Sequence, residues 1–230
     1  MFESHRMPEP EVMDDFEEVE AYSSAAAQSY LKKIDESFVA HALRLVNRRE
    51  RGRALDVGTG PGQIVVKLAR RLTRWKFVAV DRSSHMIAEA VANHAAAGPE
   101  LSGRVEFQVA DANALPFPDA TFDLVTCNSV LHHMAEPERL LAEIARVVKP
   151  RGAVLLRDLR RPGRVAYRWH VRRHGRYYSG KMRQLYEASV RAAYIAPELQ
   201  QLVDTSRIDG VRVFNEPATH IGVERWSSEQ

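Results

Sequence analysis

Short apolar runs alternate with amphipathic segments through the middle of the chain. The apolar runs have the length of buried strands and span residues 53–57, 77–81, 104–110, 122–127 and 153–158. Between them, apolar residues recur at helical spacing over 61–74, 84–96 and 136–148. This alternation is typical of βαβ units, so we predict a parallel sheet flanked by helices.

Further elements are predicted on both sides of this region. Residues 24–49 carry an apolar stripe that includes Leu31, Phe38 and Leu45, which predicts a helix before the first strand. Pro197 begins a short helix, and two β-rich runs at 211–214 and 220–223 close the chain as a hairpin.

A loop with alternate glycines, Gly58, Gly60 and Gly62, joins the first strand to the next helix. Glycine allows a tight turn and a close approach to a ligand, and free N–H groups at a helix N-terminus favour an anionic partner. We therefore predict an α/β, Rossmann-like, seven-stranded, mostly parallel sheet with helices on both faces and an antiparallel edge hairpin. The Gly-x-Gly-x-Gly spacing differs from that of dinucleotide oxidoreductases and favours S-adenosylmethionine over NAD.

Polar residues follow the neighbouring strands of the predicted sheet. Asp81 and Asp111 end two strands, and Asn128 ends another just before Leu131-His132-His133. Open α/β sheets bind ligands at the carboxyl ends of their strands, so we expect these residues to meet in one crevice.

Five segments of the chain match the motifs of a known family. They are Leu55-Asp56-Val57-Gly58-Thr59-Gly60-Pro61-Gly62, Val80-Asp81-Arg82-Ser83-Ser84-His85-Met86, Val109-Ala110-Asp111-Ala112, Asp123-Leu124-Val125-Thr126-Cys127-Asn128 and Val147-Val148-Lys149-Pro150-Arg151-Gly152. With them, the run from Ala54 to Leu156 resembles the class I S-adenosylmethionine-dependent methyltransferases, of the small-molecule type that includes ubiquinone/menaquinone C-methyltransferases.

The resemblance implies a cofactor-binding role for residues of these motifs. Asp81 would accept hydrogen bonds from the ribose, Asp111 and Ala112 would read the adenine edge, and Met86 would pack on the adenine ring. The glycine backbone would pass under the methionine part, with Asp56 and Asn128 near its amino group. The implied set is Asp56, Gly58, Thr59, Gly60, Gly62, Asp81, Arg82, Met86, Asp111, Ala112 and Asn128. From the residues alone, Asp81 and Asp111 could instead be helix N-caps, although their positions at the expected strand ends favour the cofactor role, and Met86 fits the core equally well.

Composition places the chain among ordinary enzymes. Its 230 residues carry a formal net charge of +3 and fit a single domain over 21–230, preceded by an acidic, flexible arm over 1–20. No apolar run reaches the ~20 residues of a membrane span, and the N-terminus does not read as a secretory signal, so we expect a cytoplasmic protein. A single cysteine, Cys127, excludes an internal disulfide, and no metal site is expected.

The segment 158–205 is predicted to be a basic helical lid over the substrate region. Arginines and aromatic residues are dense over 157–191, and Arg157, Arg172 and Arg173 are candidate substrate ligands. The cluster is a solvated helical face, a partner of the acidic arm, or a site that recognises an anionic group through the planar guanidinium.

Two further groups are candidates for the chemistry. His132 or His133 follows the fourth strand and either removes a proton from the acceptor or supports the loop. Tyr22 and Tyr30 either cap the substrate or pack in the core.

Three functions remain open from the sequence. The first is in-line methyl transfer to a small-molecule acceptor, anionic or aromatic, with the protein mainly orienting the reactants. The others are an RNA methyltransferase that uses segment 157–191 to bind phosphates, and a non-catalytic S-adenosylmethionine-binding protein or a nicotinamide enzyme. The oligomeric state is left open.

Overall fold

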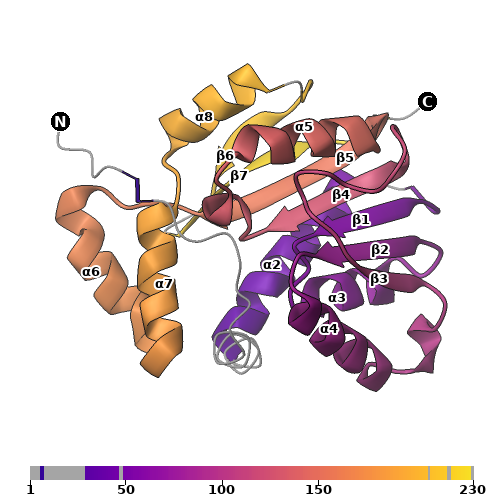
Figure 1. The fold of residues 1–230 in the computed structure, drawn as a ribbon, viewed down its shortest axis with the longest axis horizontal. Helices are drawn as coiled ribbons and strands as arrows, with labels where there is room; N and C mark the ends of the chain where they lie inside the picture. Colours follow the sequence, from indigo (N-terminus) through magenta and orange to yellow (C-terminus); the bar gives the residue numbers. More distant parts are fainter. Residues whose placement is uncertain (1–5, 8–28, 47–48, 207, 217–218, 229–230) are drawn as a thin grey trace.

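The computed structural model describes residues 6–7, 29–46, 49–206, 208–216 and 219–228 (Figure 1). Its strands are β1 (Arg53–Val57), β2 (Lys76–Asp81), β3 (Val105–Val109), β4 (Phe122–Asn128), β5 (Val148–Leu159), β6 (Arg212–Asn215) and β7 (His220–Arg225). They form one sheet of seven strands in the order β3-β2-β1-β4-β5-β7-β6. Strands β1 to β5 pair in parallel, while β7 is antiparallel to β5 and to β6, so the predicted edge hairpin is confirmed.

Helices cover both faces of this sheet, as predicted. The helices are α2 (Ser29–Leu45), α3 (Gln63–Arg71), α4 (Ser84–Ala96), α5 (Pro137–Val147), α6 (Arg164–His174), α7 (Gly180–Ala192) and α8 (Ala196–Thr205), with 3-10 turns η1 (Pro99–Leu101), η2 (Leu131–His133) and η3 (Gly175–Tyr177). Figure 1 shows α2, α3 and α4 on one side of the sheet and α5 and α8 on the other. In the described part of the chain, no helix combines the length and the apolar character needed to cross a membrane.

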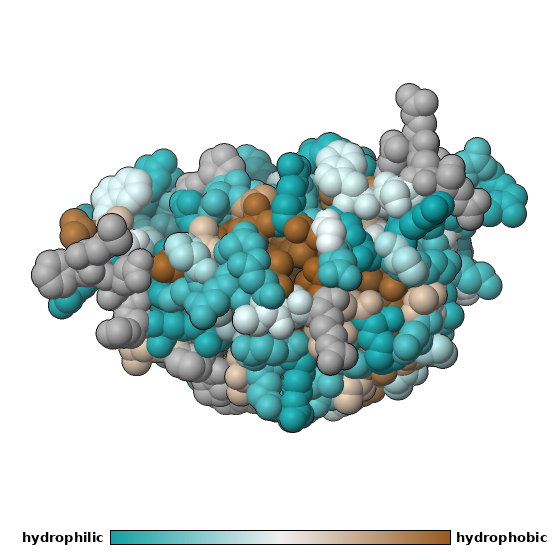
Figure 2. Space-filling model, turned by 90° about the horizontal axis from the view of Figure 1, so that it is seen from above, coloured by the Kyte–Doolittle hydropathy of each residue, from teal (hydrophilic) through white to brown (hydrophobic). Residues whose placement is uncertain are grey.

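The core divides according to which way each strand residue points. Leu55 and Val57 of β1 belong to the cluster under α5 and α8, while Ala54 belongs to the cluster under α2 and α3. Side chains alternate across a strand, and both faces are covered, so the central strands are apolar throughout. Figure 2, seen from above, shows hydrophobic side chains gathered at the centre of the face that carries α5 and α8, with hydrophilic ones around them.

Three predicted boundaries require correction. Helix α2 ends at Leu45, before the predicted end at Arg49, and the predicted start at Ser24 lies outside the described residues. Strand β5 begins at Val148, which pairs with Phe122 before the register shifts. Helix α8 packs on α5 and contributes Leu199 to the sheet core, so it is not part of a lid.

Helices α6 and α7 are the part of 158–205 that stands apart from the sheet. Figure 1 shows them beyond the carboxyl ends of the strands, across from α2. Val171, Tyr178, Tyr186 and Val190 form a small separate core between these helices. The predicted division into an arm and one domain stays a prediction, because only Arg6 and Met7 of residues 1–20 are described.

Candidate active site

The glycine loop turns at the end of β1 in a conformation that side chains disfavour. Gly58, Gly60 and Gly62 have φ values of 68°, 52° and 80°. A Cβ on Gly58 would lie 2.2 Å from Cγ2 of Val130. Glycine is therefore required at Gly58 both for the backbone conformation and for the close packing of the loop against the segment after β4.

Asp81 ties this loop to the end of β2. One carboxylate oxygen accepts a hydrogen bond from the Gly60 N–H at 2.8 Å, and the other accepts from the Ser83 N–H at 3.0 Å. Ser83 in turn caps α4, because its hydroxyl accepts a hydrogen bond from the Met86 N–H. The carboxylate is thus held in a fixed place at the rim of a cleft.

That cleft, which we call the cofactor crevice, lies where the carboxyl ends of β1, β2, β3 and β4 meet. Predicted cofactor residues that line it are Gly58, Gly60, Asp81, Arg82, Met86, Asp111, Ala112 and Asn128. The segment after β4 also lines the crevice through Ser129, Val130 and Met134, which the sequence motifs do not indicate. Ser129 has a positive φ of 60°, a strained conformation that no sequence pattern signals.

Three other residues predicted to bind the cofactor do not line the crevice. The Asp56 carboxylate accepts hydrogen bonds from the hydroxyls of Thr126 and Thr59, each at 2.7 Å, and burial raises its pKa to about 6. Gly62 precedes α3, and a Cβ at this position would lie 3.0 Å from Cβ of Ala90 in α4. Asp56 and Thr59 therefore support the glycine loop from the sheet side, and their predicted place beside the cofactor stays a prediction.

Asn128 lies between the crevice and a second pocket, which we call the acceptor pocket. The two pockets share Asn128, Ser129 and His133. Apolar and aromatic side chains line the acceptor pocket from α2, β5, the residue after η3, and α7: Leu31, Ile34, Leu159, Tyr178, Met182, Leu185 and Tyr186. Its polar side is made of His132, His133, His220 and small hydroxyl residues.

The charge of the acceptor pocket is close to neutral. Among the described residues that line it, none is an arginine or a lysine, and the carboxylate of Asp35 is paired with Lys67 at 2.8 Å. Burial lowers the pKa of His220 to about 3, so its ring is neutral at ordinary pH. The pocket therefore suits an apolar, uncharged molecule better than an anion.

His132 is held by a buried carboxylate at the back of the acceptor pocket. Its Nδ1 lies 2.5 Å from Oδ1 of Asp158, and its backbone N–H donates to Oδ2 at 2.9 Å. Burial would raise the pKa of Asp158, but the imidazole of His132 and the hydrogen bonds from His132 and Leu159 hold it below the ordinary value. A carboxylate that accepts from Nδ1–H leaves the proton-accepting lone pair on Nε2, the arrangement that a general base requires.

The two histidines differ in this respect. The ring centroids of His132 and His133 lie 4.0 Å apart, and His133 lines both pockets. Only His132 is anchored by Asp158, a residue that the sequence analysis does not single out. His132 and Asp158 are 26 positions apart in the sequence, so no local motif indicates that they pair.

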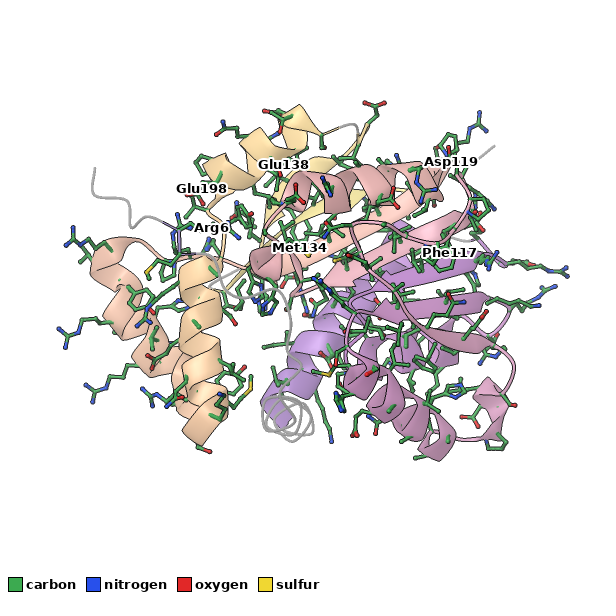
Figure 3. The ribbon with its side chains drawn as sticks, in the orientation of Figure 1. Arg6, Phe117, Asp119, Met134, Glu138 and Glu198 are labelled. Carbon is green, nitrogen blue, oxygen red and sulfur yellow. The ribbon has the colours of Figure 1, made fainter. Side chains whose placement is uncertain are left out.

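Arg6, near the amino end of the chain, is hydrogen-bonded to the segment that carries His132. Its Nε donates to the carbonyl of Ala192 at 2.7 Å, and its Nη2 donates to the carbonyl of His132 at 3.2 Å. The guanidinium lies 4.3 Å from the centroid of the Tyr194 ring. Figure 3 shows Arg6 between the segment that carries Met134 and helix α8, which carries Glu198.

Arg157 is not a substrate ligand in this structure. It is completely buried and lines neither pocket, which corrects its predicted role. Its Nε donates to Oδ1 of Asn128 at 3.0 Å, its Nη1 donates to the Ser37 hydroxyl at 2.8 Å, and its guanidinium stacks on the Phe38 ring. Arg157 thus fixes the orientation of the Asn128 amide between the two pockets.

The other predicted substrate ligands also lie elsewhere. Arg172 and Arg173 are exposed on α6 and line neither the crevice nor the acceptor pocket. Tyr22 and the side chain of Tyr30 lie outside the described residues.

Comparison with known proteins identifies what this arrangement is similar to. A family model described as "Methyltransferase domain" matches residues 55–156. The chain is 30% identical over 168 residues to a demethylmenaquinone methyltransferase of Deinococcus radiodurans, covering 70% of this chain and 68% of that protein. It is 32% identical over 130 residues to a ubiquinone/menaquinone biosynthesis C-methyltransferase of Geobacter sulfurreducens, covering 56% and 50%.

Solved structures share the fold over almost the whole chain. A putative S-adenosylmethionine-dependent methyltransferase of Methanococcus maripaludis superposes with a TM-score of 0.67 at 17% identity, covering 97% of this chain and 99% of that one. The chain spans about half the length of the first curated relatives that it matches.

Proposed function

Since this chain belongs to the class I S-adenosylmethionine-dependent methyltransferases, we propose that it transfers a methyl group from that cofactor to a small apolar acceptor. One observation carries the proposal. The crevice formed by the family's motifs adjoins a separate apolar pocket, and Asn128, Ser129 and His133 border both. Two reactants held in adjoining pockets meet in a defined orientation, which by itself contributes about 7–11 kcal/mol toward a bimolecular reaction.

The residues of the crevice fit the cofactor chemically. Asp81 presents a carboxylate suited to two ribose hydroxyls, and Asp111 with the backbone of Ala112 suits the edge of an adenine. Met86 and Met134 supply apolar walls for its ring. When bound, S-adenosylmethionine would supply an electrophilic methyl group to a nucleophile in the acceptor pocket.

The lining of the acceptor pocket supports an aromatic, hydroxylated acceptor such as a phenol or a hydroquinone. Tyr178, Tyr186 and Leu159 suit a flat apolar ring, while His132 and His133 suit a hydroxyl group. The names of the relatives, which refer to ubiquinone and menaquinone, agree with this class of acceptor. A carboxylate or phosphate would find no cation among the described lining residues, so an anionic acceptor is disfavoured.

His132 is the base that this arrangement favours. With Nδ1–H directed at Asp158, Nε2 is able to accept the hydroxyl proton, and the buried carboxylate stabilises the imidazolium that results. Removing that proton makes the ring oxygen, and the ring carbon conjugated with it, a stronger nucleophile. Asn128, fixed by Arg157, and His133 would then position the reacting end of the ring between the two pockets.

The proposal is tested by measuring S-adenosylhomocysteine formation with matched acceptors. We expect turnover with hydroquinones and phenols that exceeds turnover with benzoates of the same size by at least tenfold. An in vitro transcribed RNA would serve as the competing acceptor. Methylation of RNA with none of the phenols, or cofactor binding without turnover of any acceptor, would refute the small-molecule assignment.

A further inference from the structure

Helix α6 has one buried side and one side that faces solvent. His170 and Val171 are buried, and Val171 packs with Tyr186 and Val190 of α7. On the other side, the side chain of Val165 is 98% exposed and that of Trp169 is 63% exposed. The exposed arginines around them are Arg164, Arg168, Arg172 and Arg173. We call this set of six residues the α6 outer face.

The residues of the α6 outer face form two adjacent rows. Residues four apart lie one above the other on a helix. One row is therefore Arg164, Arg168 and Arg172, and the other is Val165, Trp169 and Arg173, in which the guanidinium of Arg173 lies 5.4 Å from the centroid of the Trp169 ring. Arg176 and Arg183 extend the basic surface along a shallow groove beside Trp169.

This charge is poorly balanced within its own segment. Glu187 is the one acidic residue in the sequence from 159 to 197. It is bonded to Arg183 at 3.3 Å and lies 4.0 Å from Arg191. Like charges four residues apart weaken a helix, so the arginine row on α6 does not serve the stability of that helix.

We propose that the α6 outer face docks on an anionic lipid surface. Arginines attract lipid phosphates, and a tryptophan and a valine between them would enter the boundary between headgroups and acyl chains. RNA would also attract the arginines and stack on Trp169, but it offers nothing to the almost fully exposed side chain of Val165. The row of Val165 and Trp169 is what favours lipid.

The α6 outer face lies near the acceptor pocket. The α6 outer face and the acceptor pocket belong to the same pair of helices, because Val171 of α6 packs with Tyr178 and with α7, and Tyr178, Met182 and Leu185 line the pocket. Docking through α6 would therefore bring the acceptor pocket close to the membrane surface, where apolar acceptors are concentrated. The docking itself does not depend on which reaction the site performs.

Cosedimentation of the full chain with vesicles tests the proposal without an activity readout. We expect binding to phosphatidylcholine vesicles that contain phosphatidylglycerol, weaker binding at high salt, and little binding to pure phosphatidylcholine. Each basic residue near such a surface contributes about fivefold to partitioning. Arg172→Glu with Arg173→Glu should therefore weaken binding at least about 25-fold.

Two more variants separate the lipid from other partners. Val165→Ser keeps every charge and keeps Trp169, and we expect it to weaken vesicle binding severalfold, whereas RNA binding through the arginines and Trp169 would not change. Arg51→Glu with Arg151→Glu is the control of equal charge, at exposed positions near the amino ends of the strands, and should bind vesicles far more tightly than the α6 charge reversal. Equal binding to both vesicle types, equal loss in the control, or RNA binding in place of vesicle binding would overturn the proposal.

Discussion

Replacing Asp158 with asparagine tests the role of the buried carboxylate behind His132. Asp158 accepts from Nδ1 of His132 at 2.5 Å, from the His132 N–H at 2.9 Å and from the Leu159 N–H at 2.6 Å. An asparagine has one oxygen and an NH₂ group, so it is unable to accept all three hydrogen bonds. If its oxygen takes the place of Oδ2 and keeps the bond from the His132 N–H, its NH₂ group takes the place of Oδ1, faces Nδ1 and shifts the ring proton to Nε2. The ring nitrogen that should accept the substrate proton is then already protonated.

The size of the effect follows from this change of tautomer. Loss of a general base lowers turnover by about 10²–10⁴-fold, equivalent to about 3–5 kcal/mol in the activation free energy. Asp158 lines neither pocket, so the KM for the acceptor and the Kd for the cofactor should change little. A large fall in kcat at nearly constant KM is therefore the expected signature.

Steady-state S-adenosylhomocysteine formation between pH 6 and 9 measures kcat and the KM for the acceptor. The rise of turnover with pH that reports deprotonation of the base in the wild type should be lost in Asp158→Asn, and His132→Ala should not reduce turnover further when combined with it. Glu138→Gln, an exposed change on α5, is the neutralising control. Turnover within about threefold of wild type, with an unchanged pH profile, would refute the base role and leave Asp158 as a support for the loop.

Three further predictions concern the cofactor crevice and the stability of the fold. Asp81→Ala should weaken S-adenosylmethionine binding by about 1.5–3 kcal/mol, measured by calorimetry, and an unchanged Kd would contradict its place in the crevice. Gly58→Ala should lower the Tm because its φ is +68° and the new Cβ would lie 2.2 Å from Val130, and adding Val130→Ala should restore only part of it. His220 has a folded pKa of about 3 against 6.5 when exposed, so the unfolded chain binds more protons and the free energy of unfolding should fall by about 2 kcal/mol from pH 7 to 5. Urea titrations of His220→Gln should show a flatter pH dependence, and an identical slope would argue that this histidine is protonated in the folded chain.

The sequence by itself determined the sheet, the glycine loop and the strand-end acids. Each of these depends on neighbours in the chain: apolar runs next to segments of helical period, glycines spaced two apart in the loop, and Asp81 as the last residue of its strand. Residues at the ends of parallel strands can be placed from the sequence, because parallel strands bring their carboxyl ends to one edge of the sheet. Asp81, Asp111 and Asn128 accordingly meet in the crevice as predicted.

Only the tertiary structure decided which polar residues face a pocket and which support one from behind. Arg157 and Asp158 are adjacent, yet side chains alternate across a strand, so Arg157 turns to α2 and Asp158 turns to His132. In the sequence, Arg157 is grouped with the arginines of α6 because their density is visible there and their burial is not. Whether an ionisable side chain is buried, and beside what, depends on contacts between segments far apart in the chain. The hydrogen bonds joining Asp158 to His132 and Arg157 to Asn128 exist because the completed sheet leaves these groups no water to bond with.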